Sequence, residues 1–190
     1  MKLARIATDE GVRTGRYEDG AVTTDDGERY AEADYDLLAP CEPSALYCVG
    51  RNYAATVEQM GYDAPEVPDF FIKPPTSVLA PGADVEYPSF TGEFTYAGEL
   101  AAVVGERCHD LEEREVDDAL LGYTVMNDLD ALDQVGRTAR KAFDGSAPLG
   151  PYVETELDPD DVRMETYVAG EKRQDATTAQ TFFSPRELVA

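Results

Sequence analysis

The side chains of this chain that could do chemistry are mostly carboxylates. Its 190 residues include 39 Asp and Glu, 16 Lys and Arg, three Cys and one His. Carboxylates bind hard cations such as Mg²⁺ and transfer protons. The single His109 leaves almost no material for a Ser-His-Asp or Cys-His mechanism, and scattered thiols cannot complete a structural zinc site. The chemistry must therefore come from carboxylates and the few lysines.

Two carboxylates stand out by their position along expected strands. Glu99 lies in an apolar run that predicts a long strand over residues 95–104, and Asp128 ends a buried strand over 122–127. In so acidic a chain, these residues are either cation ligands or ordinary surface carboxylates, and the local pattern leaves both open. Lys141 is a third candidate, because the chain has only four lysines and otherwise uses Arg.

The charge balance excludes some classes of partner. A formal net charge of −23 rules out sequence-general DNA or RNA binding, and it disfavours docking to an anionic membrane surface. Neither an apolar run of membrane-spanning length nor a signal peptide is recognisable, so we expect a cytoplasmic protein with reduced thiols. The acidic, Lys-poor composition favours adaptation to high salt, where carboxylate repulsion is screened, over an ordinary acidic protein.

Turn and capping signals predict an α+β fold with mixed, mainly antiparallel sheets and a few short helices. Asp19-Gly20 predicts a hairpin within a small N-terminal β segment, residues 1–40. The remaining domain is expected over residues 45–190, with a helix over 53–60 that Asn52 caps and Gly61 ends. Ser184 to Glu187 predicts a helix start only six residues before the last residue. We therefore expect that domain to be incomplete at its C-terminal end.

Five ordered blocks resemble the fumarylacetoacetate hydrolase family, which includes acylpyruvate hydrolases and 2-hydroxyhepta-2,4-diene-1,7-dioate isomerases. The blocks are residues 47–54, 69–75, 96–105, 122–128 and 141–151. This resemblance implies a divalent-metal-dependent hydrolase, isomerase or decarboxylase that acts on small 2-oxo or 1,3-dioxo acids, as in aromatic catabolism. It also implies a homodimer with neither nucleic acid nor membrane as partner.

The resemblance assigns roles residue by residue. Glu99 and Asp128 match metal ligands for Mg²⁺, or alternatively Mn²⁺ or Ca²⁺, and Lys141 matches the lysine that holds substrate oxygens. The flanking motif residues match substrate-binding positions, namely Arg51, Tyr53 and Lys73.

Three positions depart from the family pattern. Thr56 and Gln59 replace the catalytic His and its Glu partner, and Ala97 replaces a third metal-binding Glu. Neither Thr56 nor Gln59 can act as a general base near neutral pH. We therefore expect weak metal binding and slow or absent C–C hydrolysis, whereas keto–enol tautomerisation or decarboxylation could survive. The alternative is a catalytically inactive relative that keeps the fold for ligand binding or assembly.

Overall fold

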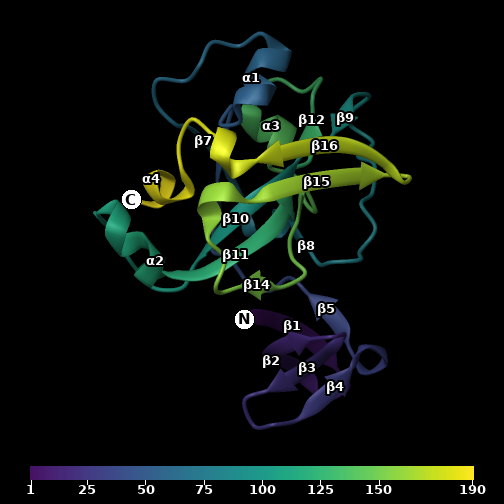
Figure 1. Ribbon diagram of the computed structural model, residues 1–190. Coiled ribbons are helices and arrows are strands. Elements are labelled where there is room, and N and C mark those ends of the chain that lie inside the picture. The colour runs from purple at the N-terminus through teal and green to yellow at the C-terminus, as the bar shows by residue number, and fades with distance from the viewer.

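The computed structural model describes residues 1–190 (Figure 1). Most strand pairs are antiparallel, the helices are short, and the expected α+β class is confirmed. No helix is both long enough and apolar enough to cross a membrane. The four α-helices are α1 (Ala54–Met60), α2 (Val116–Ala119), α3 (Arg137–Lys141) and α4 (Pro185–Val189).

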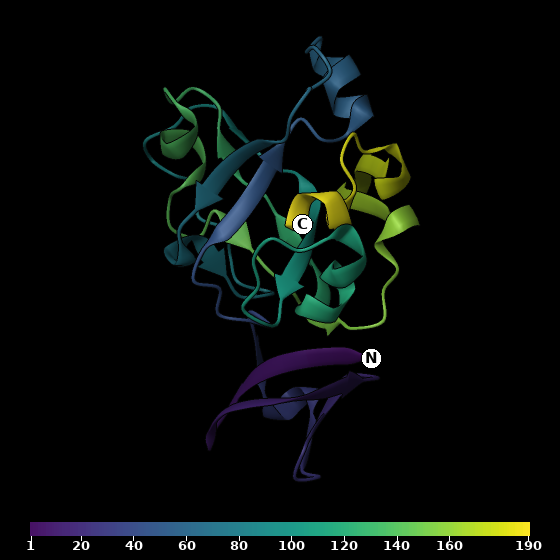
Figure 2. The ribbon, with the colours of Figure 1, turned by 90° about the vertical axis from the view of Figure 1, so that its left-hand side faces the viewer.

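The largest sheet joins the N-terminal strands to the rest of the chain. Strand β14 pairs with β1 on one side and with β11 on the other, and the N-terminal strands form a layer at one end of the molecule (Figure 2). In spatial order, with β5 (Asp36–Leu38) also paired to β1, the sheet contains β10 (Gly98–Val104), β11 (Leu120–Asn127), β14 (Val153–Glu154), β1 (Lys2–Thr8), β2 (Gly11–Glu18), β3 (Ala21–Thr24) and β4 (Arg29–Ala31).

The hairpin between β2 and β3 turns at Asp19 and Gly20, as expected. Both residues have positive φ, 50° and 78°, which is the conformation of a tight hairpin turn. Behind it, Ala4, Ile6 and Val22 form a small buried cluster. The N-terminal segment therefore has its own apolar packing within the shared sheet.

Four two-stranded sheets surround β10 and β11. Only one of them is parallel, the pair β8 (Val78–Leu79) and β13 (Ala147–Pro148). The antiparallel pairs are β6 (Leu46–Gly50) with β7 (Asp69–Lys73), β9 (Phe94–Thr95) with β12 (Asp130–Ala131), and β15 (Arg163–Val168) with β16 (Glu171–Thr177).

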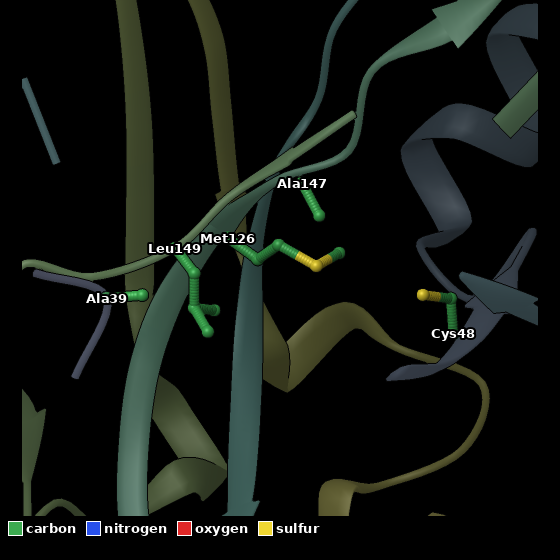
Figure 3. Packing of buried hydrophobic residues seen from close by; sticks show 5 residues of the cluster. All are labelled: Ala39, Cys48, Met126, Ala147 and Leu149. Atoms are coloured by element: carbon green, nitrogen blue, oxygen red, sulfur yellow. The ribbon is translucent and has the colours of Figure 1, made fainter. Parts of the chain in front are cut away.

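A second apolar cluster joins these pairs. Met126 on β11 extends toward the Cys48 thiol on β6, and Ala39, Ala147 and Leu149 complete the cluster (Figure 3). Their burial holds the β6–β7 strand pair against the large sheet.

Two local expectations differ from the structure. Residues 95–104 form two assigned strands, β9 and β10, although the pairing continues in one register because Ala97 and Asp128 exchange backbone hydrogen bonds of 3.1 and 2.8 Å. Asn52 does not cap α1. Its side-chain amide donates to the carbonyl of Phe183 and its Oδ1 accepts from the Phe183 N–H, both at 2.9 Å, while Gly61 does end the helix in the left-handed conformation.

Side chains also form hydrogen bonds with backbone groups that no neighbouring strand pairs. The Gln174 amide on β16 accepts from the Gly98 N–H at 2.8 Å and donates to the Gly98 carbonyl at 2.7 Å, at the start of β10. At the other end of the chain, Ser184 and Glu187 form the expected capping box of α4.

Candidate functional site

The paired strands β10 and β11 bring two carboxylates onto one face. Glu99 lies opposite Met126 and Ala97 lies opposite Asp128. Because side chains alternate along a strand, these four residues share a face, and Glu99 and Asp128 are diagonal neighbours. The register therefore brings together the two proposed metal ligands, and it places Ala97 beside both.

Lys73 reaches this face from β7 and is fully buried. Its ammonium donates to the carbonyls of Leu129, Lys141 and Ser146 at 3.1, 2.8 and 2.9 Å. An ammonium has three hydrogens, so these bonds use all of them. Lys73 Nζ also lies 2.9 Å from Asp128 Oδ1 as an ion pair.

Burial lowers the pKa of Lys73, although Asp128 opposes the shift. With every donor engaged, Lys73 has no hydrogen left for a substrate. Its geometry makes it a support for the Asp128 loop.

Lys141 lies between two buried aspartates. Its ammonium contacts Asp128 Oδ2 and lies 3.3 Å from Asp130 Oδ2. Arg140 forms a two-pronged pair with Asp130, with Nε 2.8 Å from Oδ1. Asp130 and Arg140 thus hold Lys141 beside the β10–β11 face.

Glu99 differs from Asp128 because its carboxylate makes no hydrogen bond or ion pair with the protein. Burial, reinforced by the nearby charge of Asp128, raises the pKa of Glu99 to about 7. Both carboxylates line a cavity of about 1040 Å³ between β6, β7, β10 and α4. Most of the other lining residues are apolar, and Glu42 is the third carboxylate among them.

Two further cavity residues remain protonated at neutral pH. Burial, with a smaller contribution from Asp128, raises the pKa of the Cys48 thiol to about 12, so this thiol is not a nucleophile. Burial and then Glu99 raise the pKa of Tyr53. Tyr53 therefore presents a hydroxyl to the cavity, while Cys48 belongs to the apolar cluster.

Glu99 and Asp128 offer the oxygen ligands that a hard divalent cation takes, with the Asp128 carboxylate already paired to two lysines. Asp128 Oδ1 is buried and has no hydrogen-bond partner, although it lies 2.9 Å from the Lys73 ammonium, and Lys141 contacts Oδ2. Glu99 makes no hydrogen bond or ion pair and is free to bind an ion. No group of three or more His, Cys, Asp or Glu side chains gathers around a common point. A hard cation would therefore take two protein ligands and complete its shell with water or ligand oxygens.

Thr56 and Gln59 lie apart from this charge network. Both are exposed on α1, where Val57 is the only buried residue. Neither lines the cavity. Lys141 does not line it either, but its ammonium contacts Asp128, which does. The structure therefore brings together Glu99, Asp128 and Lys141, but it does not bring Thr56 or Gln59 to them.

Arg51 directly follows strand β6, next to the start of β7, where Asp69 binds two guanidinium groups. Arg51 Nη2 and Arg137 Nη2 each lie 2.9 Å from Asp69 Oδ2. Arg51 has a positive φ of 59°, an uncommon conformation for a residue with a side chain. Arg137 comes from α3, the helix that also carries Arg140 and Lys141.

Several of these residues carry no recognisable functional signal in the sequence. Asp130 was recognisable only as a neighbour of Asp128, and its pairing with Arg140 and Lys141 depends on where α3 packs. Arg137 and Asp69 are 68 positions apart, and no local pattern links them.

Comparisons with known proteins identify a matching family and several similar proteins. The sequence profile described as fumarylacetoacetate hydrolase C-terminal matches residues 45–190. Protein Rv2993c of Mycobacterium tuberculosis is 37% identical over 160 residues, which are 80% of this chain and 60% of that protein. The chain thus spans less than two thirds of that relative's length.

A curated enzyme and a solved structure are also similar. Oxaloacetate tautomerase YcgM of Escherichia coli is 35% identical over 158 residues, covering 77% of this chain and 72% of that protein. The crystal structure of 5-carboxymethyl-2-hydroxymuconate delta-isomerase from Mycobacterium smegmatis is 37% identical with a TM-score of 0.91. That match covers 100% of this chain and 80% of the isomerase.

Proposed function

The chain belongs to the fumarylacetoacetate hydrolase family, as its motifs predicted, and on this premise we propose that it tautomerises small 2-oxo acids. The carrying observation is the Lys141 ammonium, which Asp128 and Asp130 hold beside Glu99. Interconversion of a keto acid and its enol moves a proton between the α-carbon and the carbonyl oxygen by way of solvent, and the intermediate enolate carries negative charge on that oxygen. A fixed ammonium stabilises that charge in a site from which much of the water is excluded.

The residues divide into contact and positioning roles. Lys141 binds the carbonyl oxygen that gains charge, and the Tyr53 hydroxyl offers a second donor from the cavity wall. Lys73 and Asp130 position Asp128 and Lys141 without touching the substrate. Family members commonly bind a divalent metal, and Glu99 and Asp128 would hold Mg²⁺ here. When bound, such an ion supplies Lewis-acid stabilisation of an enolate.

Hydrolysis of a carbon–carbon bond is less well supported. It requires a base that activates water, and helix α1 offers only Thr56 and Gln59 at the expected positions. General-base catalysis is typically worth about 10²- to 10⁴-fold in rate. We therefore expect tautomerisation to exceed acylpyruvate cleavage. The second candidate, a non-catalytic relative, is favoured by these same two residues.

The test follows the decay of enol absorbance in oxaloacetate solutions with Mg²⁺ present. Lys141→Met should slow the catalysed decay by about 10²-fold or more, as losing a charge-stabilising donor does elsewhere. Lys172→Met is the matched control, because Lys172 pairs with acids on the exposed β15–β16 hairpin. Decay no faster than in buffer would instead support the non-catalytic relative, and equal rates for both variants would refute the role of Lys141.

A further inference from the structure

Two ion-pair networks around the site each contain one more cation than anion. In the first, Lys73, Lys141 and Arg140 share two aspartates, Asp128 and Asp130. The ion pairs alone therefore leave one positive charge without a paired carboxylate, in a chain with a formal net charge of −23. Glu99 lies on the cavity side of this network, and in the proposed function a divalent cation matches its charge.

The second network consists of Arg51, Arg137 and Asp69. Both guanidinium groups share one carboxylate oxygen, Asp69 Oδ2, so one positive charge is unmatched. Arg51 and Arg137 are about two fifths exposed, so an incoming anion can reach them. Gly50 makes room for this arrangement, because a Cβ at that position would lie 2.7 Å from Arg137 Nη1.

Phe71 on β7 connects the two networks. Arg137 Cζ lies 5.1 Å from the ring centroid, and Lys141 Nζ lies 5.0 Å from the same centroid. The two cations are therefore separated by no more than about twice that distance. A short carbon chain carrying two carboxylates can extend over a separation within this bound, so that one carboxylate meets each cation.

We propose that Arg137 and Arg51, gathered around Asp69, form a second anion-binding site that takes the distal carboxylate of a dicarboxylic ligand. The near end of that ligand lies at Lys141. This inference rests on the proposed function and adds to it a specificity-determining residue, Arg137. A charge-assisted bond from a guanidinium to a carboxylate is about twice as strong as a neutral hydrogen bond. Losing it should weaken the binding of a dianion while leaving a monoanion unaffected.

The experiment is calorimetric titration with succinate and with butyrate, which has four carbons but one carboxylate. The wild-type chain should bind succinate about tenfold more tightly than butyrate, and Arg137→Gln should abolish that preference without changing butyrate affinity. Arg137→Lys, which keeps the charge, should restore part of it. Arg163→Gln is the matched control, because Arg163 pairs with acids on the exposed β15–β16 hairpin.

Each outcome decides a separate claim. Equal succinate affinity in the wild type and in Arg137→Gln, or a wild type without preference for succinate, overturns the second anion site. An Arg137-dependent preference for succinate upholds it, even if oxaloacetate is not tautomerised, in which case only the proposed function fails. Kinetics add a further readout. Arg137→Gln should raise KM for oxaloacetate about tenfold with little change in kcat, and it should leave the 4-ethyl ester of oxaloacetate unaffected.

Discussion

Helices α1 and α3 are both short, but they differ in what ties them to the molecule. Helix α1 buries one side chain, Val57, and leaves Thr56 and Gln59 in solvent. Helix α3 buries no residue completely, yet Arg137, Arg140 and Lys141 all pair with aspartates of other elements.

This difference shows which part of the chemistry is built into the fold. The α3 side presents fixed positive charge next to two carboxylates, which suits stabilisation of an enolate. The α1 side presents no base at the expected positions. Substitutions on the two sides should therefore have very different effects.

The largest effect on stability is expected from Lys73→Met, which removes the buried cation paired with Asp128. Three carbonyl groups and one carboxylate oxygen would lose a buried partner. Breaking a buried ion pair in this way costs about 3–5 kcal/mol of unfolding free energy. Urea denaturation measures the loss, with Lys172→Met as the exposed control. Equal midpoints for the two variants would contradict the structural role of Lys73.

The pH dependence of stability should follow Glu99 when a chelator removes divalent metal. Its pKa is about 7 in the folded chain against 4.5 for an ordinary Glu, so protonated Glu99 favours the folded state. This contribution is fully present below pH 4.5 and is lost as pH rises through 7, for a total of roughly 3 kcal/mol at most. Glu99→Gln should flatten the stability profile between pH 5 and 8. Parallel profiles for both proteins would refute the assignment.

A smaller gain is expected from Ala97→Glu in metal binding. The register puts residue 97 beside Glu99 and opposite Asp128, so a third carboxylate there should tighten Mg²⁺ binding by on the order of tenfold. Tyr96→Glu is the control, because it adds the same charge to the opposite face of the strand. Calorimetry that finds the same gain in both variants would mean that the effect is only one of net charge.

The smallest effects are expected on α1. Thr56→Ala and Gln59→Ala should each change the unfolding free energy by less than about 0.5 kcal/mol, because both side chains are exposed. Neither should alter oxaloacetate tautomerisation. Val57→Ala on the same helix should cost about 1 kcal/mol or more, since Val57 is buried. A large loss of activity in Gln59→Ala would reveal that α1 does take part in the reaction.

Local signals predicted the elements whose geometry depends on near neighbours. Asp19 and Gly20 make their turn, and Ser184 and Glu187 their capping box, with partners only a few residues away. Asn52 did not cap α1 because Phe183, 131 residues later, takes its amide.

In the candidate site, too, contacts between residues distant in the chain were not predictable from the sequence. The strand pattern placed Glu99 on one strand and Asp128 at the end of another, but it did not show that the two strands pair. A lysine inside the apolar stretch before Pro74 likewise gives no sign that it will be completely buried. The role of Lys73 arises from carbonyl groups more than 50 residues away in the chain. Arg137 joined Asp69 for a comparable reason, since packing of α3 decides the pairing.

The amide of Gln174 has a consequence for solubility. Strand β10 is the last strand of the largest sheet, and an uncovered strand edge is a template for pairing with a foreign chain and hence for aggregation. By taking both backbone polar groups of Gly98, Gln174 imitates the neighbouring strand that is missing there. Glycine at 98 permits this close approach, because a Cβ would lie 2.6 Å from Thr166 Oγ1. One hairpin thus protects the start of this edge from sheet growth between molecules.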